Sequence, residues 1–248
     1  MKQAAFQIVL PAIGASSNRG AMGWCNISLI ETGDRTILFD TGSNDDRPEL
    51  LAELARMGVD VKDIDAVFLS HFHYDHCCNI EVFEDADIYV SARELEYVLS
   101  GEFKTYGDPY IPYGMIRYYE QRFIPFADGE ELFPGLRTLA LPGHTPGVSG
   151  LILEESRVVL TGDSVKNAYD YTHGIPPYAI YDAEKGLESY TRIPPVADTI
   201  VPGHGRPFSV REGRISYVGE QKPVDMMIFP NLEHLDALEE RACHRIIL

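Results

Sequence analysis

The chain has 248 residues, of which 45% are hydrophobic and 24% are charged, so miniproteins, fibrous proteins and disordered chains are excluded. The formal net charge is −17, and because a surface this acidic repels phosphates and anionic lipid headgroups, we expect no nucleic-acid or membrane partner. No apolar run approaches the roughly 18 residues that a membrane-spanning helix needs. The cysteines follow no disulfide or CxxC pattern, which indicates a cytoplasmic protein.

Turn residues and apolar runs predict the elements of the first part of the chain. Strands are expected at 27–30 and 36–39, followed by a helix at 47–57. The short, wholly apolar run 66–69 indicates a strand that is buried on both faces. Further along, the predicted elements are a strand at 87–90, a helix at 92–99, strands at 136–141, 149–153 and 158–161, a helix at 182–193 and a strand at 199–201. Because no regular βαβ repeat appears, we expect helices packed outside sheets.

We predict a single domain over 1–248 that carries two additions. An aromatic insert at about 101–126 is dense in Tyr and Phe, and it is either a wall of the substrate pocket or a contact of a homodimer. A C-terminal extension at about 206–248 ends in an amphipathic helix predicted for 231–245, a second candidate dimer contact.

A dense group of potential metal ligands follows the buried strand 66–69. His71 and His73 alternate along an extended segment, so both side chains can face one ion, whereas Asp75 and His76 then turn toward a second. Packing alone does not explain three histidines beside a carboxylate, because buried polar groups are costly without partners. The pattern therefore indicates a metal site.

Three later loops each add one further ligand type directly after a hydrophobic strand. His144, Asp163 and His204 lie in the Gly- or Pro-containing loops at 143–147, 161–164 and 202–205. Separately, each loop is typical of a turn, because Gly, Pro and Asp dominate turns for conformational reasons. Together with the HxHxDH segment, they predict a metal centre where the strands end.

In chain order, the segments HFHYDH, LPGHTPG, TGDS and VPGHG resemble the metallo-β-lactamase superfamily over roughly residues 20–210. The resemblance implies an α/β fold, the αββα sandwich, in which two mixed β-sheets carry helices on their outer faces and the metal site lies at one edge. It also implies a ligand set: the first metal is bound by His71, His73 and His144, the second by Asp75, His76 and His204, and both by the bridging Asp163.

These ligands predict a hydrolase with two divalent metal ions. Mixed imidazole and carboxylate ligands suit zinc first, with iron, cobalt or manganese as alternatives. Two such ions lower the pKa of a bridging water and polarise a carbonyl oxygen. We therefore expect a bridging hydroxide to attack a carbonyl carbon, with Asp75 as the catalytic proton shuttle.

Among the branches of the superfamily, the chain is most similar to the quorum-quenching N-acyl homoserine lactonases, which implies a small-molecule lactone or a related cyclic amide as substrate. Those lactonases usually carry a Tyr three residues after the bridging Asp, where this chain has Lys166. A lysine there favours an anionic substrate, and a solvent-facing side chain is the alternative. Tyr169 and His173 are further candidate substrate contacts, Tyr169, or alternatively Tyr171, in place of the usual Tyr and His173 at the mouth of the site.

Other readings of the same motifs remain open. A thioester hydrolase of the glyoxalase II type shares the bridging Asp, but the tail after Gly205 is short and mixed in charge. A mononuclear-iron persulfide dioxygenase shares HxHxDH and GHTPG, yet His204 completes a second site and argues against it. Zinc β-lactamases usually lack the bridging Asp. A binding module without activity is disfavoured, because unpaired buried Asp and His are costly to keep.

Overall fold

The structure, a computed structural model, describes residues 4–18, 20–21, 23–211, 213–220, 223–227 and 243–247. Where the sequence predicts one domain, the chain groups into two compact units, Met1–Val218 and Gly219–Leu248. In the second unit, β16 (Pro223–Met227) pairs with β17 (Cys243–Ile247). Most of the helix predicted at 231–245, residues 231–242, lies outside the described residues. Its last three residues, 243–245, belong to strand β17 instead.

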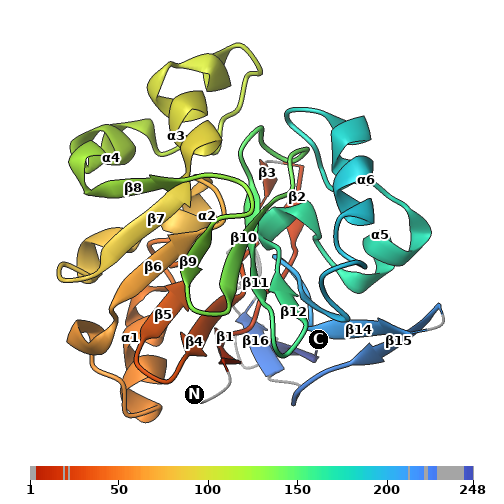
Figure 1. Cartoon of the computed structure of the whole chain (residues 1–248), viewed down its shortest axis with the longest axis horizontal. Helices are drawn as coiled ribbons and strands as arrows, with labels where there is room; N and C mark the ends of the chain where they lie inside the picture. The colour runs from red at the N-terminus through yellow and green to blue at the C-terminus, as the bar shows by residue number, and fades with distance from the viewer. Residues whose placement is uncertain are drawn as a thin grey trace, which may run out of the picture. The chain divides into compact units, whose positions relative to one another are not determined.

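The first unit is built around two mixed sheets (Figure 1). In the order of the first sheet, its strands are β1 (Ala5–Leu10), β4 (Ile27–Glu31), β5 (Thr36–Phe39), β6 (Ala66–Leu69), β7 (Asp87–Ser91) and β8 (Phe123–Phe126). The strands from β5 to β8 run parallel to one another, and β1 and β4 are antiparallel to their neighbours. A separate short hairpin joins β2 (Ser16–Ser17) to β3 (Gly20–Ala21).

The second sheet is antiparallel except for one pair. Its strands in order are β15 (Arg214–Tyr217), β14 (Phe208–Arg211), β13 (Thr199–Val201), β12 (Val158–Leu160), β11 (Ser149–Leu153), β10 (Leu136–Ala140) and β9 (Glu131–Phe133). The parallel pair is β12 and β13, whose carboxyl ends therefore point the same way. The C-terminal extension predicted at about 206–248 is divided between the two units. Its strands β14 and β15 belong to this sheet, and the residues from Gly219 onward form the second unit.

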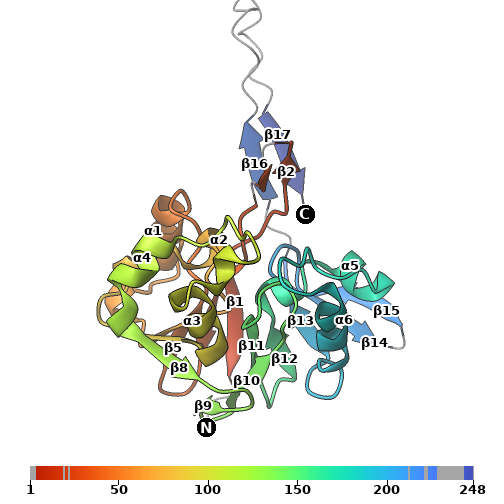
Figure 2. The ribbon, with the colours of Figure 1, turned by 90° about the horizontal axis from the view of Figure 1, so that it is seen from above.

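Helices cover the outer face of each sheet, as Figure 2 shows. On the side of the first sheet lie α1 (Arg47–Arg56), α3 (Ala92–Leu99) and α4 (Tyr113–Tyr118), and on the side of the second lie α5 (Ala168–His173) and α6 (Ala183–Thr191). Short helical segments complete the description: α2 (Tyr74–Cys77), η1 (Val61–Asp63), η2 (Ile80–Val82), η3 (Glu102–Lys104), η4 (Glu120–Arg122) and η5 (Gly162–Ser164). Among the described residues, no helix is long and apolar enough to cross a bilayer.

Strand β6 shows why the sequence folds into these layers. Val67 and Leu69 pack with the helix-side core, whereas Ala66 and Phe68 pack with the core between the sheets. Both faces of the strand are therefore buried, which explains its uniformly apolar sequence and agrees with the sequence prediction. The αββα sandwich predicted from the motifs is confirmed.

The aromatic insert is more regular than its sequence indicates. It contains η3, α4 and η4 and ends in β8, which pairs with β7 at the edge of the first sheet. Pro125 interrupts the strand pattern of β8, and an edge strand tolerates it because one side of the strand needs no hydrogen-bond donors. The insert is thus part of the first layer of the sandwich.

Candidate metal centre

The predicted ligands meet where strands of both sheets end. His71 and His73 directly follow β6, and Asp163 lies in η5 directly after β12. The other ligands come from the neighbouring helix α2, from the loop between β10 and β11 and from the loop after β13: Asp75 and His76, His144, and His204.

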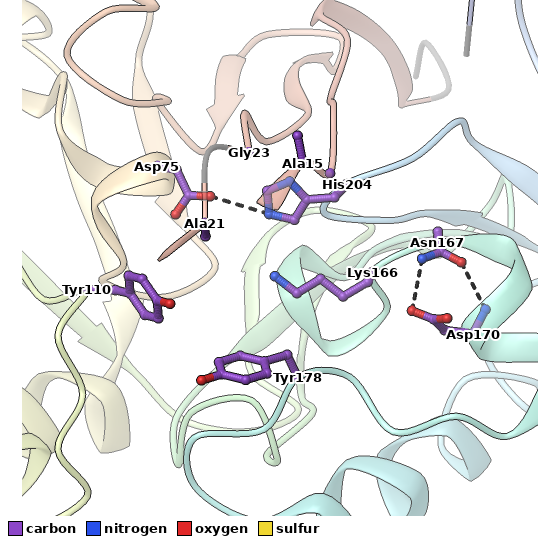
Figure 3. Close-up of a pocket in the computed structure, with 11 residues that line it drawn as sticks. Ala15, Ala21, Gly23, Asp75, Tyr110, Lys166, Asn167, Asp170, Tyr178 and His204 are labelled. Atoms are coloured by element: carbon purple, nitrogen blue, oxygen red, sulfur yellow. Dashed lines mark hydrogen bonds and ion pairs between the residues drawn. The ribbon is translucent and has the colours of Figure 1, made fainter. Parts of the chain in front are cut away.

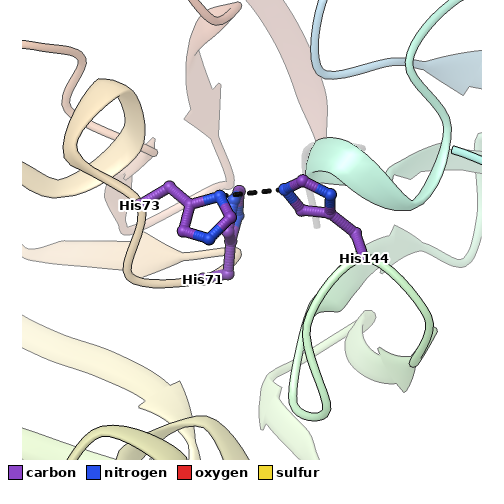
Figure 4. A group of neighbouring side chains, drawn as sticks. All are labelled: His71, His73 and His144. Atoms are coloured by element: carbon purple, nitrogen blue, oxygen red, sulfur yellow. Dashed lines mark hydrogen bonds between the residues drawn. The ribbon is translucent and has the colours of Figure 1, made fainter. Parts of the chain in front are cut away.

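Three histidines form the first cluster of ligand atoms. One nitrogen of each of His71, His73 and His144 lies within 4.8 Å of the others. His73 Nδ1 and His144 Nε2 are 2.9 Å apart. Figure 4 marks this pair with a dashed line. All three side chains are buried, so a cation held between them is shielded from solvent.

A second cluster lies beside the first, and Asp163 faces both. Asp75, His76 and His204 have ligand atoms within 4.8 Å of one another. Asp163 Oδ1 lies 3.2 Å from His76 Nε2 and 3.1 Å from His204 Nε2. The other oxygen of Asp163, Oδ2, lies 3.3 Å from His144 Nε2. One carboxylate thus presents a separate oxygen to each cluster.

The buried atoms at this centre fit a metal. His71 Nε2, His76 Nε2, His204 Nε2 and Asp163 Oδ1 are shielded from solvent and form no hydrogen bond. Leaving such groups unpaired in the interior is costly, and a bound metal ion would compensate for that cost. Imidazole nitrogens and a carboxylate oxygen are the donors of zinc sites and related transition-metal sites.

Two carboxylates orient two of the histidines by accepting a hydrogen bond from the ring nitrogen that points away from the cluster. His73 Nε2 donates to Asp108 Oδ2 over 3.0 Å, and His76 Nδ1 donates to Asp40 Oδ2 over 2.7 Å. A carboxylate only accepts, so the proton of each imidazole is held on the nitrogen that faces away from the cluster. The nitrogen that faces the cluster is left with a free lone pair, as a metal ligand requires.

The remaining histidines have oxygen partners of other kinds. His204 Nδ1 donates to the carbonyl oxygen of Trp24 over 3.0 Å, and His144 Nδ1 donates to the carbonyl oxygen of Tyr178. His71 Nδ1 lies 2.9 Å from Ser70 Oγ, which itself donates to Asp40. Every histidine of the centre is therefore oriented by a hydrogen bond on its outer nitrogen.

At three of the ligands, electrostatics favour the form that binds a cation, whereas at His76 the acidic groups nearby outweigh burial and raise its pKa well above the usual value. Burial lowers the pKa of His71 well below its usual value, and neighbouring histidines add to the shift. Burial also lowers the pKa of His144, with a contribution from the Lys166 ammonium. Burial alone would raise the pKa of Asp163, but His204, Lys166 and His76 outweigh it and hold this pKa well below its usual range. Neutral imidazoles and an ionised carboxylate are the metal-binding states.

The loop that carries His204 owes its shape to a glycine and a buried amide. A Cβ atom on Gly203 would overlap the carboxylate of Asp163, so another residue there would displace Asp163. Asn26 is buried, and its Nδ2 donates to the carbonyl oxygens of Pro202 at 2.7 Å and Gly205 at 2.6 Å. The ligand loop is thereby tied to the start of β4.

A pocket of about 500 Å³ opens beside the second cluster (Figure 3). Asp75 and His204 belong to its wall, and the Lys166 side chain points into the pocket. The Lys166 ammonium also forms an ion pair with the buried Asp163. Two tyrosines contribute aromatic surface, and small residues of the N-terminal segment and two polar residues at the start of α5 complete the lining: Tyr110, Tyr178, Gly14, Ala15, Ala21, Gly23, Asn167 and Asp170.

The predicted substrate contacts fall into two groups. Lys166 lies in the pocket, beside the predicted metal ligands. Tyr169 and His173 lie on α5, where their rings stack on each other with centroids 4.0 Å apart, and neither belongs to the pocket wall. The side chain of Tyr169 is 62% exposed. Their contact with substrate stays a prediction.

Several functional residues escaped the sequence analysis. Asp40 ends β5 in the same way that ligands end other strands, a signal that could have pointed to it. Asp108 has no such signal, because it lies in the aromatic insert, 35 positions from His73. Asn26 and the backbone carbonyl of Tyr178 likewise act through contacts that only the folded chain creates.

The sandwich and its histidine-rich centre define a class of metal-dependent hydrolases. The family model of the metallo-beta-lactamase superfamily matches residues 23–204, so this chain belongs to that superfamily. Metallo-beta-lactamase domain-containing protein 1 of Xenopus laevis is 33% identical to it over 190 residues, which cover 75% of this chain and 72% of that protein. The membership predicted from the motifs is thus confirmed.

Lactonases also occur among the similar proteins. An N-acyl homoserine lactonase of a Bacillus species is 26% identical over 197 residues, which cover 68% of this chain and 74% of that protein. Among solved structures, a dizinc quorum-quenching lactonase in complex with a product has a TM-score of 0.65 at 20% identity. That match covers 82% of each chain, and it shows that the fold is shared.

Proposed function

We propose that this chain is a dinuclear metal-dependent hydrolase that opens a cyclic ester (a lactone) or a related cyclic amide. Asp163 carries this proposal, because its two oxygens face the two ligand clusters separately. A carboxylate shared in this way suits two neighbouring divalent ions. The N-acyl homoserine lactonase of Bacillus supports a lactone, including a quorum signal, as the substrate.

The residues of the centre would hold the two ions as two sets of donors. His71, His73 and His144 would bind one, Asp75, His76 and His204 the other, and Asp163 both. When bound, the ions would polarise a substrate carbonyl and supply a nucleophile from water at neutral pH. The donor set favours zinc, with iron, cobalt or manganese as alternatives.

The side chains around the centre perform the remaining tasks. Asp75 lies in the pocket wall, and its Oδ2 is 3.4 Å from His204 Nε2. A carboxylate at this boundary is placed to accept a proton and to pass it to the leaving oxygen or nitrogen. Tyr110 and Tyr178 offer rigid apolar surface with a polar tip, which suits the non-reacting part of a small molecule.

A pH-indicator screen of lactones, cyclic amides, thioesters and β-lactams tests this function. We expect acid release from at least one lactone, or formation of the free amine from at least one cyclic amide, with loss of that activity after chelation and recovery when zinc is restored. Acid release from thioesters alone would favour the glyoxalase II type instead. Oxygen uptake with a thiol persulfide, without acid release, would contradict hydrolysis.

We further propose that the substrate carries an anionic group that Lys166 binds. The ammonium lies within the pocket of a chain whose net charge is −17, so it supplies local positive charge that the surface lacks. Its side chain is 22% exposed, which leaves it partly accessible from the pocket.

Replacing Lys166 by methionine is expected to raise KM for carboxylate-bearing substrates roughly tenfold, because a charge-assisted contact is lost. This change is equivalent to a loss of about 1.4 kcal/mol in binding free energy. Neutral lactones should lose less than anionic ones, because only the ion pair of Lys166 with Asp163 is lost for them, and the matched variant Lys166→Arg should retain the preference. Steady-state kinetics on paired neutral and anionic substrates measure this. An equal loss on both kinds would contradict the anion-binding role.

A further inference from the structure

The aromatic insert contributes a buried carboxylate that the proposed reaction does not use. Asp108 is 6% exposed and lies between η3 and α4. Its Oδ2 accepts hydrogen bonds from His73 Nε2 over 3.0 Å and from the Tyr97 hydroxyl over 3.1 Å. Its Oδ1 accepts from the backbone N–H of Tyr110 over 3.0 Å. Both oxygens are therefore engaged with donors, and one donor is a predicted metal ligand.

The consequence for His73 follows from the proton inventory of imidazole. A neutral ring carries a single N–H, and the carboxylate holds it on Nε2 because a carboxylate has no proton to donate. Nδ1 then keeps its lone pair, and this is the atom that lies 2.9 Å from His144 Nε2 in the first cluster. A proton on Nδ1 would instead occupy the direction in which a metal binds.

We propose that Asp108 is a positioning residue, which fixes the tautomer and the ring orientation of His73 so that Nδ1 faces the first metal. The insert 101–126 is thereby part of the scaffold of the metal centre, a role distinct from a pocket wall or a dimer contact. This inference rests on the metal site of the proposed function, and it does not depend on which substrate is hydrolysed.

An asparagine at position 108 has nearly the same shape but only one accepting oxygen. If that oxygen faces the N–H of Tyr110, the amide NH₂ faces His73 and donates to Nε2, which moves the imidazole proton to Nδ1. In the opposite orientation the NH₂ meets the N–H of Tyr110, and two donors confront each other. The first orientation costs less, because the Tyr97 hydroxyl can rotate to accept.

The test combines the variant Asp108→Asn with the control Tyr97→Phe, which removes one hydrogen bond to the carboxylate and leaves the carboxylate itself in place. Imidazole ¹⁵N shifts of the metal-free full chain report the tautomer of His73, whose signals are assigned with His73→Gln. Competition with a chromophoric chelator measures the affinities of the first and second zinc ions.

We expect Asp108→Asn to shift His73 to the Nδ1–H form and to weaken one zinc ion roughly 10- to 100-fold, with the other changed less than about threefold. Tyr97→Phe should keep the Nε2–H form and both affinities within about threefold. A merely structural role would leave the tautomer unchanged in the folded variant.

An Nδ1–H tautomer in the unsubstituted protein would overturn the inference without any variant, so the test survives a variant that fails to fold. Unchanged zinc affinities in folded Asp108→Asn would also overturn it. The proposed function fails separately, when the unsubstituted protein binds zinc but hydrolyses no cyclic ester or amide.

Discussion

Replacing Asp163 by asparagine is expected to lower kcat/KM by roughly 1,000-fold or more, equivalent to about 4 kcal/mol of transition-state stabilisation. The substitution removes a side chain whose two oxygens face both ligand clusters, together with its negative charge. The amide keeps one weakly donating oxygen, so two cations would be held close together without a shared anion between them. Metal content should fall along with activity.

Asp170→Asn is the matched control for this substitution, because Asp170 is a carboxylate of the same pocket that pairs with Asn167 rather than with the ligands. Its kcat/KM should stay within about threefold of the unsubstituted protein. Elemental analysis and steady-state kinetics on both variants measure the difference. Asp163→Asn with full metal content and more than about a tenth of the activity would contradict the bridging role.

Glu94→Gln is expected to destabilise the fold by about 3 kcal/mol, or about 6–12 °C in melting temperature for a domain of this size. Glu94 is fully buried on α3, and its Oε1 accepts from the N–H of Phe72, between two ligand histidines. Its Oε2 accepts from the Thr145 hydroxyl at 2.7 Å and from the N–H of Gly147 at 3.1 Å.

One carboxylate thus ties together the two loops that carry the first ligand cluster. A glutamine can supply only one accepting oxygen, so its NH₂ would confront the N–H of Gly147. Leaving a buried donor without an acceptor costs the full desolvation of that group. We therefore expect weaker zinc binding at the first cluster as well as lower stability.

The control for Glu94 is Glu96→Gln on the same helix, where the side chain is 69% exposed. An exposed ion pair contributes little to the free energy of unfolding. The melting temperature of Glu96→Gln should therefore differ from that of the unsubstituted protein by less than about 2 °C. Thermal unfolding of both variants, followed by circular dichroism, measures the difference. Equal melting temperatures for the two variants would show that Glu94 does not hold the ligand loops together.

Strong local patterns made much of the fold predictable. The run 66–69 is apolar throughout because β6 is buried on both faces, and its strand is confirmed at the expected residues. The edge strand β8 was missed, since Pro125 breaks the pattern that identifies a strand. The hairpin of β14 and β15 was missed for a different reason, because its mostly exposed residues carry little hydrophobic periodicity.

At the candidate site, the ligands were predictable and their supports were not. His71 and His73 stand out in the sequence because polar residues directly after a buried strand are uncommon without a role. Asp108 and Glu94 act over long sequence separations, through single hydrogen bonds that leave no local pattern. The outward stacking of Tyr169 on His173 is likewise set by the orientation of α5, which no spacing encodes.

The most direct test of the two-metal centre is metal stoichiometry, measured by elemental analysis on protein purified without added metal. The account predicts about two divalent ions per chain, because Asp163 presents one oxygen to each of two ligand clusters. About one iron ion per chain, unchanged after incubation with zinc, would contradict it and would make the second cluster a set of buried side chains without a metal.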